Sequence, residues 1–286
     1  MGKIIWLASY PKSGNTWLRV VLTNYLRDST EPADINDLER TPIASGRALF
    51  DEIMGISAAD LTPTEIACLR PALYEQLAAE SAEPLFMKVH DAYTYTPQGI
   101  PLLAKAATQG AIYLIRNPLD VAVSLAHHNN ESLDYTIRRM NTVQDLLTYH
   151  PSSLLKQLPQ QLLGWSGHVQ SWLDEPHLSV HLLRYEAMQR TPMAAFGAAL
   201  QFAGVAVEAA RLQRALHHAS FATLQQQEQR HGFGERLSAA QSFFRKGTIG
   251  DWRNVLTSAQ VECLVQTHGA VMRRFGYLSE TGEIRD

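Results

Sequence analysis

The residues best suited to chemistry form a short polar segment, residues 10–17, between an apolar run and a helical pattern. A strand-to-helix turn that contains a glycine directs several main-chain N–H groups and the positive end of the helix toward one point, which favours an anion. Lys12 adds a full positive charge, and the hydroxyls of Ser13 and Thr16 add donors. The segment therefore predicts a site for a phosphate or sulfate group.

This segment differs from the P-loop of nucleotide triphosphatases. That loop places a Lys-Ser or Lys-Thr pair at the start of the helix, preceded by a glycine and with another glycine five residues earlier. Here Lys12 comes before Gly14, and the earlier glycine is missing. An ordinary polar turn is the alternative, but so many phosphate-suited donors in one turn favour the anion site.

A second candidate for binding an anion is Arg116, within residues 113–124. A strand pattern ends at Arg116 and a helix begins at Pro118. An arginine held at the carboxyl end of a strand can grip a phosphate through its planar guanidinium. A structural ion pair between Arg116 and Asp120 or another neighbour is the alternative.

A third basic segment spans residues 245–252. Arg245 and Lys246 stand directly before Gly247, an arrangement that suits a flexible clamp over an anion. Isolated basic pairs also occur on solvated surfaces, which is the alternative for this segment.

Lys88 and His90 are the candidates for proton transfer and charge stabilisation. Residues two apart in a strand point to the same face, so both side chains should converge on one site. A lone histidine is more often structural, but the position of His90 at the end of a strand favours catalysis. The adjacent histidines at 127–128 and 217–218 lie in helical patterns, where neighbours diverge by about 100°, and no metal site is predicted.

The elements that must position these residues are short apolar runs, each followed by a turn and a helical pattern. They predict strands at residues 4–9, 85–89, 111–115 and 178–183. Strands alternating with helices indicate an α/β fold with a central parallel sheet flanked by helices. Ligands of such sheets bind beyond the carboxyl ends of the strands. We expect one domain, residues 1–286.

Helix starts are marked by capping residues and prolines. Thr62, Pro63 and Glu65 predict an N-cap, a first helical residue and a capping box. Further starts are expected at 117–118, 191–192 and 257–260, with Gly276 ending the last helix. The polar stretches between them predict long connections of the kind that form lids and binding loops: 28–60, 129–158 and 225–244.

Composition excludes several classes of protein. The net charge of −3 argues against a protein that coats nucleic acid. No apolar run reaches the roughly 18–20 residues of a membrane span, and the N-terminus does not resemble a signal peptide. Cys68 and Cys263 lie far apart, which indicates reduced thiols. We therefore expect a cytoplasmic protein with no nucleic-acid or membrane partner.

Taken together, the three anion-binding segments resemble those of the soluble sulfotransferases that use 3′-phosphoadenosine 5′-phosphosulfate (PAPS). They occur in the family's order across most of the chain. The resemblance implies a P-loop-like fold, shared with nucleotide kinases, a bacterial member of the family, PAPS as donor, 3′,5′-adenosine bisphosphate (PAP) as product, and no metal. Asn15 stands where the family more usually has Thr, and its side chain can still donate.

The resemblance also implies a role for each matching residue. Lys12 and residues Ser13, Gly14, Asn15 and Thr16 would hold the 5′-phosphate end of PAPS, with Trp17 stacked on the adenine. Arg116 and Ser124, together with the loop of Arg245, Lys246 and Gly247, would hold the 3′-phosphate. Tyr185 would contact the adenine, and Ser220 and Phe221 match a segment that touches the nucleotide; core or surface packing is the alternative for these three.

The resemblance further implies a mechanism. Neutral His90 would take the proton of the acceptor, while Lys12 and Lys88 stabilise the leaving phosphate oxygen. The expected acceptor is a small molecule with a hydroxyl group, with an amine or a glycan as alternatives. Two other functions stay open: a nucleotide kinase or hydrolase with the same anion-binding turn, and a non-catalytic nucleotide-binding protein.

The segment that contains Arg253, Thr257 and Glu262 has two equally supported explanations, which differ in the oligomeric state they imply. Arg253, Thr257 and Glu262 resemble a short dimerisation segment of the family, which normally begins with Lys and has Val where Ser258 stands. This segment would form a homodimer. An ordinary helix start with an exposed ion pair is the other explanation.

Overall fold

The computed structural model describes residues 3–144, 146–148, 154–237 and 240–286. The chain divides into two compact units. Unit 1 comprises Met1–Tyr10, Arg40–Tyr113 and Val143–Leu182, and unit 2 comprises Pro11–Glu39, Leu114–Thr142 and Leu183–Asp286. The single domain expected over residues 1–286 stays a prediction. Parts of two predicted connections, residues 145, 149–153 and 238–239, lie outside the described residues.

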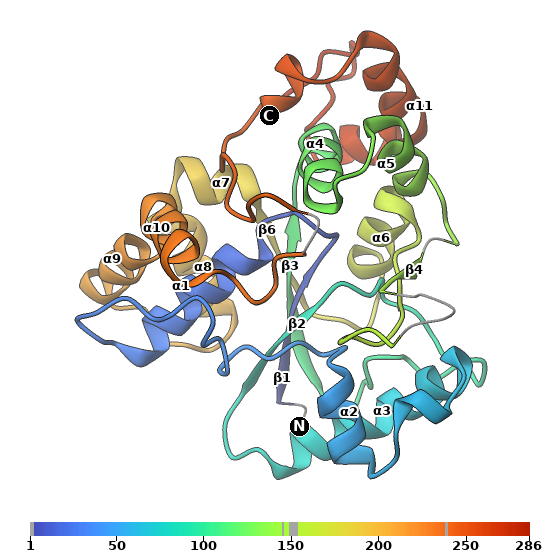
Figure 1. Cartoon of the computed structure of the whole chain (residues 1–286), viewed down its shortest axis with the longest axis vertical. Helices are drawn as coiled ribbons and strands as arrows, with labels where there is room; N and C mark the ends of the chain where they lie inside the picture. The colour runs from blue at the N-terminus through green and yellow to red at the C-terminus, as the bar shows by residue number, and fades with distance from the viewer. Residues whose placement is uncertain (1–2, 145, 149–153, 238–239) are drawn as a thin grey trace. The chain divides into compact units, whose positions relative to one another are not determined.

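A four-stranded parallel sheet, flanked by helices, carries the strands in the order β2-β1-β3-β6 (Figure 1). In parallel pairing, Ile4 of β1 lies opposite Leu85 of β2, and Ala8 lies opposite Val89. The carboxyl ends of these two strands therefore share one edge of the sheet, where ligands of such folds bind. The four strands are β1 (Ile4–Ser9), β2 (Leu85–Val89), β3 (Thr108–Ile115) and β6 (Val180–Arg184).

All four predicted strands are confirmed, two of them with shifted bounds. β3 begins at Thr108, before the apolar run at 111–115. The first residues of β3 are therefore polar, and no apolar pattern marks them in the sequence. One of them, Thr108, has a buried partner, because its hydroxyl accepts from the indole Nε1–H of Trp6 over 2.8 Å. β6 occupies Val180–Arg184 instead of residues 178–183.

The helices of unit 1 begin at well-defined caps. The Thr62 hydroxyl accepts from the Glu65 amide, and the Glu65 carboxylate accepts from the Thr62 amide, which confirms the predicted capping box. Two short strands pair antiparallel, β4 (Leu146–Leu147) and β5 (Gln160–Gln161). The helices are α2 (Arg47–Met54), α3 (Pro63–Glu80) and α6 (Gly164–Leu173), with a 3₁₀ turn at Ala58–Asp60.

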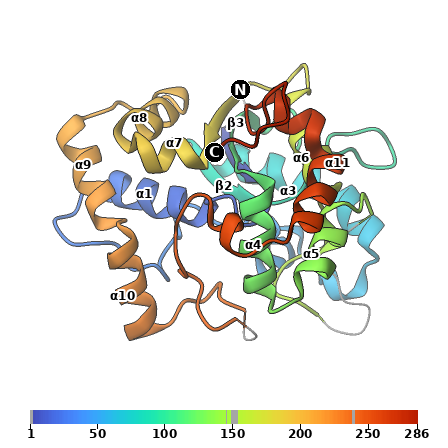
Figure 2. The same cartoon turned by 90° about the horizontal axis from the view of Figure 1, so that it is seen from above.

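Unit 2 is built almost entirely of helices. α1 packs along α9, and α4, α5 and α11 form a second group (Figure 2). The predicted starts at Asn117, Thr191 and Thr257 are confirmed, and Gly276, with a φ of 74°, follows the end of α11. The helices are α1 (Asn15–Arg27), α4 (Pro118–Asn129), α5 (Leu133–Met140), α7 (Tyr185–Arg190), α8 (Pro192–Phe202), α9 (Ala209–His218), α10 (Phe221–His231) and α11 (Ser258–Arg274), with a 3₁₀ turn at Asp251–Asn254.

Helices interrupt the three stretches that the sequence predicts to be long connections. α2 lies within residues 28–60, α5 within 129–158, and α10 extends to His231. α5 is capped locally, because the Ser132 hydroxyl accepts from the Tyr135 amide. The polar composition of these stretches hid helices that bury few residues each, such as Phe50 in α2 and Ile137 in α5. None of the described helices combines the length and the apolar composition that crossing a bilayer requires.

Candidate functional site

The turn that precedes α1 has the backbone of an anion-binding loop. Lys12 has a φ of 69° and Gly14 a φ of 102°, so two residues of the turn adopt left-handed conformations within three positions. Gly14 is the N-cap of α1 and offers no side chain to the first amides of the helix. Those amides and the positive end of the helix dipole therefore suit an external anion, as the sequence predicts.

Gly14 is required at its position for two reasons. Its positive φ disfavours any residue with a Cβ. A Cβ added there would also lie 2.7 Å from Cδ2 of Tyr185, well inside contact distance. The turn therefore packs directly on the Tyr185 ring, which is buried.

Two buried polar atoms near this turn point to a ligand. Among the described residues, Ser13 Oγ and Arg116 Nε have no hydrogen-bond partner. Ser13 is 1% exposed and Arg116 is 8% exposed. A buried polar group without a partner costs about 1–3 kcal/mol, which an anion bound against these donors would offset. The residues present therefore fit a phosphate-bearing ligand.

Arg116 connects the turn to the segment that precedes α11. Its Nη1 donates to the Lys12 carbonyl over 3.0 Å, and its Nη2 donates to the Thr248 carbonyl over 3.2 Å. The guanidinium lies 4.1 Å over the Tyr185 ring. Arg116, which lies in the second predicted anion-binding segment, thus brings all three segments together.

Asp120, the predicted alternative partner of Arg116, has main-chain partners. Its carboxylate accepts from the Gly250 amide at 2.7 Å and from the Trp252 amide at 3.1 Å. Burial raises the pKa of Asp120, against the opposing effects of the Arg116 charge and these two amides. Asp120 therefore ties residues 250–252 to α4.

The basic pair of the third segment is held by a carboxylate. Arg245 Nη2 lies 2.6 Å and Lys246 Nζ 2.7 Å from the Asp251 carboxylate. Burial alone would raise the pKa of Asp251, but the hydrogen bonds from Lys246 and Arg245 outweigh it and lower that pKa. The two cations are anchored within the loop by Asp251, and the clamp over an anion stays a prediction.

The glycine that follows this pair is fixed by packing. Gly247 has a φ of 63°, and a Cβ there would lie 2.6 Å from Cδ2 of Phe221. Gln189, which the sequence analysis missed, donates to the Gly247 carbonyl over 2.9 Å and to the Tyr185 hydroxyl over 3.1 Å. Its position within a turn of Tyr185 on a helix is the only signal that could have revealed it.

The remaining candidates of unit 2 lie around this core. The Trp17 indole donates to the Ala219 carbonyl over 3.0 Å and packs edge-on against Tyr185. Ser220 caps α10, accepting from the Thr223 amide. Ser124 lies one turn after Asp120, on the same face of α4. Trp17 and Ser220 thus have structural roles within the protein. That these residues also contact a nucleotide stays a prediction.

The charges of cations from two of the segments act on one side chain of unit 2, His127. Partial burial lowers the pKa of His127, and the charges of Arg245, Lys12 and Lys246 lower it further, against the opposing charge of Asp251. The Lys12 ammonium lies 4.0 Å over the Phe243 ring. From its sequence position, next to His128 in a helical pattern, His127 could be assessed only as a metal ligand. Lys12, Arg245 and Lys246 are far from His127 in sequence, so only the fold shows that their charges act on it.

In unit 1, His90 directly follows β2 and contacts the end of β1. Its Nδ1 lies 2.8 Å from the Ser9 carbonyl oxygen and 3.2 Å from the Ser9 hydroxyl. A carbonyl oxygen only accepts, so Nδ1 carries the proton and donates it. In the neutral form of the ring this places the basic lone pair on Nε2, which is the state a general base requires.

Lys88 is buried in β2, with its main chain paired on the side away from β1. Its amide donates to the Pro42 carbonyl and its carbonyl accepts from the Ala44 amide, both at 2.8 Å. Lys88 and His90 belong to unit 1, whereas Lys12 and the other candidates belong to unit 2. Among the described residues, no three His, Cys, Asp or Glu side chains gather in a group that could hold a metal ion.

The segment that resembles a dimerisation motif is engaged within the chain. Arg253 pairs with Asp286 and lies 4.5 Å over the Trp252 ring. Thr257 forms a capping box with Gln260 at the start of α11. These contacts confirm the helix start, and the homodimer stays a prediction.

Comparison of the sequence with known proteins gives a consistent result. A model of the sulfotransferase domain matches residues 3–276. Sulfotransferase 1B1 of the mouse (Mus musculus) is 27% identical over 274 residues, 90% of this chain and 79% of that protein. Sulfotransferase 1A1 of the dog (Canis lupus familiaris) is 27% identical over 266 residues, with coverage of 90% and 79%. The bacterial origin implied by the resemblance stays a prediction.

Solved structures show the same fold. Mouse sulfotransferase SULT7A1 complexed with PAP matches with a TM-score of 0.59 and 21% identity, covering 95% of this chain and 85% of that one. A retinol dehydratase in complex with androsterone and PAP matches with a TM-score of 0.59 and 17% identity, covering 99% and 82%. The predicted α/β fold with a central parallel sheet and P-loop-like architecture is thereby confirmed.

The packing of Gly14 gives a test by substitution. Gly14→Ala should lower the free energy of unfolding by about 1–3 kcal/mol more than Gly204→Ala, measured by denaturant unfolding. Both glycines have positive φ, but a Cβ at Gly204 meets nothing within 4 Å, so this control isolates the backbone cost. Equal losses in the two variants would show that the turn does not depend on contact with Tyr185.

Proposed function

The chain belongs to the sulfotransferase family, and on that premise we propose that it transfers a sulfuryl group from PAPS to the hydroxyl of a small-molecule acceptor, releasing PAP. The observation that carries this proposal is the turn before α1, with its two left-handed residues and the partnerless Ser13 Oγ and Arg116 Nε. The PAP in the mouse SULT7A1 complex supports the choice of donor. An amine or a glycan is the alternative acceptor.

We assign the two ends of the donor to the two segments that Arg116 connects. The turn before α1 would hold the 5′ end through main-chain amides and side-chain donors, namely Lys12, Ser13, Gly14, Asn15 and Thr16. The 3′-phosphate would be held by Arg116, Ser124, Arg245, Lys246 and Gly247. The adenosine would lie against Trp17, Tyr185, Ser220 and Phe221. The hydrogen bonds from Arg116 to Lys12 and Thr248 support one continuous donor site.

The anchored pair Arg245 and Lys246 is compatible with this assignment. Their side chains remain 26% and 49% exposed while they contact Asp251, so each keeps a side open to a phosphate. Asp251 neutralises only part of their charge, and the segment stays net positive. The carboxylate would then pre-organise the two cations, which lowers the cost of ordering them on binding.

His90 is the proposed general base. With Nδ1 donating to Ser9, Nε2 is the proposed nitrogen that takes the acceptor proton as the acceptor oxygen forms its bond to sulfur. Bound PAPS supplies the sulfuryl group and a phosphate leaving group. Lys12 and Lys88 are proposed to stabilise charge on that leaving oxygen. β1 and β2 end in register at Ala8 and Val89, so His90 lies at the sheet edge from which the turn leaves β1.

Two finer proposals follow from the family. We propose a cytoplasmic location and a homodimer formed through the segment of Arg253, Thr257 and Glu262. In such a homodimer, Arg253 would contact the second subunit while it also pairs with Asp286 of its own chain.

The experiment that tests the function measures donor binding and transfer together. By calorimetry in the presence of a chelator, PAP should bind, and Lys12→Ala or Arg116→Ala should weaken that binding at least tenfold. Radiolabelled PAPS should then pass sulfate to a member of a panel of phenols, alcohols and amines. Binding of ATP only with Mg²⁺, and none of PAP, would indicate a nucleotide kinase. PAP binding with no transfer to any acceptor would indicate a non-catalytic protein.

The role of His90 has a separate kinetic signature. His90→Ala should lower kcat by about 10²- to 10⁴-fold, the usual contribution of general-base catalysis, while the Kd of PAP stays unchanged. Steady-state kinetics and calorimetry on the same preparation measure both quantities. An unchanged kcat would remove His90 from the role, and a weakened Kd would place it in donor binding instead.

The cations around His127 predict a response of its pKa to the donor. Partial burial, together with the charges of Arg245, Lys12 and Lys246, holds the pKa of His127 below its ordinary value. Phosphates bound to these cations would favour the charged ring, so PAP should raise the pKa of His127 and bind more tightly as the pH falls through that window. NMR titration with and without PAP measures the shift, with His127→Gln assigning the resonance. A pKa that stays constant or falls would place the phosphates elsewhere.

A further inference from the structure

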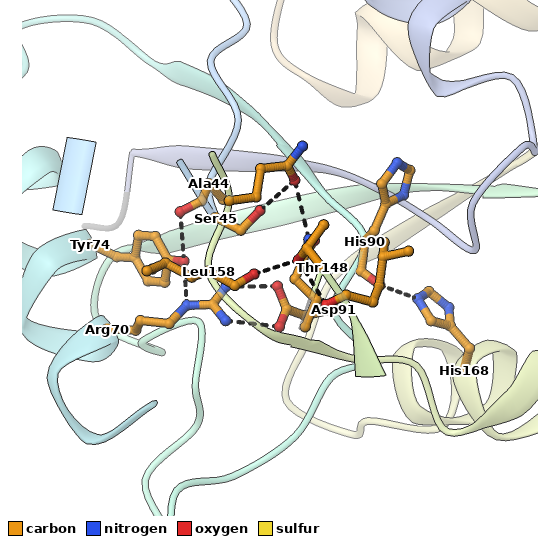
Figure 3. Close-up of polar contacts among 12 residues, drawn as sticks. Ala44, Ser45, Arg70, Tyr74, His90, Asp91, Thr148, Leu158 and His168 are labelled. Carbon is orange, nitrogen blue, oxygen red and sulfur yellow. Dashed lines mark hydrogen bonds and ion pairs between the residues drawn. The ribbon is translucent and has the colours of Figure 1, made fainter. Parts of the chain in front are cut away.

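A buried ion pair lies directly beside His90 in unit 1 (Figure 3). Arg70 of α3 donates from Nη1 and Nη2 to the two carboxylate oxygens of Asp91, over 2.8 and 2.6 Å. The two side chains are 2% and 1% exposed. Asp91 follows His90 in the chain, so the residue after the proposed base is held by a bidentate contact. The cost of removing two charges from water can exceed the attraction between them, so a buried ion pair need not stabilise the fold. The pair therefore calls for another role.

The same guanidinium also reaches the residues before His90. Arg70 Nε donates to the Tyr74 hydroxyl over 3.0 Å, and that hydroxyl donates to the Ala44 carbonyl over 3.1 Å (Figure 3). The Ala44 amide in turn donates to the Lys88 carbonyl over 2.8 Å. Arg70 is therefore connected to the main chain on both sides of His90.

Helix α6 fixes the peptide units of His90 and Asp91 from another direction. His168 Nε2 lies 3.0 Å from the His90 carbonyl oxygen, and the Trp172 indole donates to the Asp91 carbonyl over 3.0 Å. His168 and Trp172 are four residues apart and share one face of α6. Two ring N–H groups one turn apart thus hold two consecutive carbonyls.

The protonation state of His168 is determined by its surroundings. The His90 carbonyl only accepts, so His168 Nε2 carries a proton, and Nδ1 accepts from the Tyr113 hydroxyl over 2.8 Å. Burial lowers the pKa of His168 to about 4, against the opposing effect of the His90 carbonyl. The ring is therefore neutral, fully hydrogen-bonded and not itself a candidate for proton transfer to solvent.

We propose that Arg70, Asp91 and His168 are positioning residues for His90. They hold the main chain at 90–91 so that the His90 ring keeps Nδ1 on the Ser9 carbonyl and presents Nε2 to the acceptor. This inference rests on the proposed function, in which His90 is the general base. Fully satisfied buried networks hold a defined geometry, and a displacement of about 1 Å at a catalytic group can cost about 10²-fold in rate.

His168 allows a test with a matched rescue. His168→Phe keeps the ring volume and removes the donor to the His90 carbonyl, whereas the amide nitrogen of His168→Gln can replace Nε2. We expect kcat to fall about 10- to 100-fold in the first variant, with the Kd of PAP unchanged, and to recover most of that loss in the second. Thr108→Val, which removes the partner of Trp6 elsewhere in unit 1, is the control for general destabilisation and should leave kcat unchanged.

A readout independent of the acceptor comes from the His90 ring itself. Long-range ¹H–¹⁵N correlation spectra of the PAP-bound protein report which ring nitrogen carries the proton, with His90→Gln assigning the signal. The wild type and His168→Gln should show the Nδ1–H form, and His168→Phe should show a mixture of both forms. A pure Nδ1–H form in His168→Phe, with unchanged kcat, would overturn the inference.

The ion pair is tested by removing both charges together. Replacing only one partner would leave a buried charge and endanger folding, whereas the double variant Arg70→Met/Asp91→Leu keeps the volume without that cost. It should remain folded and lose kcat about as much as His168→Phe. It also keeps the test decisive should His168→Phe fail to fold. A folded double variant with full activity and an unaltered His90 signal would overturn the role of the pair.

A double-mutant cycle separates this inference from the proposed function. If His168 acts through His90, His168→Phe should lower the rate no further in a His90→Ala background. Retention of kcat by His90→Ala alone would contradict the proposed base. Loss of kcat in His90→Ala, with an equal further loss on adding His168→Phe, would leave the base in place and overturn the positioning role. The transfer assay would use 4-nitrophenol, 1-butanol and butylamine as acceptors.

Discussion

The backbone of the turn between β1 and α1 is the constraint on which the proposed donor site depends. Lys12 and Gly14 both adopt positive φ, which turns the chain sharply enough to open the first amides of α1 to an anion. The Tyr185 ring packs against Gly14, and Arg116 lies over that ring while donating to the Lys12 carbonyl. The side chains that support this strained turn are thus the ones the function would use. Strain of this kind persists only where the surroundings over-determine it.

Buried carboxylates in both units organise the cations and main chain near the proposed chemistry. In unit 2, Asp251 holds Arg245 and Lys246, and Asp120 holds the amides of residues 250 and 252. In unit 1, Asp91 is held by Arg70 beside His90. The phosphates and the sulfate of a sulfuryl donor carry several negative charges, so a protein that binds it needs fixed cations at those positions. The modest net charge of −3 is consistent with cations concentrated locally.

The sequence could predict the parts of this structure that depend on local patterns. The four strands, the capping box at Thr62, the helix start at Thr257 and the turn at residues 10–17 follow from periodicity and capping chemistry. It could not predict that Arg245 and Lys246 share Asp251, or that Arg116 binds the Lys12 and Thr248 carbonyls, because these contacts depend on side-chain geometry. Arg70, Tyr113 and His168 lie far from His90 in sequence, and only the fold brings them together. The short helices α2 and α5 were missed because the polar composition of their stretches resembles that of a loop.

The central claim is that the turn before α1 holds the 5′-phosphate of an adenosine bisphosphate, and a crystal structure of the protein grown with PAP tests it most directly. The account predicts that oxygens of the 5′-phosphate accept hydrogen bonds from Ser13 Oγ and from main-chain amides of residues 13–17, while the 3′-phosphate contacts Arg116. A 5′-phosphate bound elsewhere, with Ser13 Oγ still lacking a partner, would contradict it.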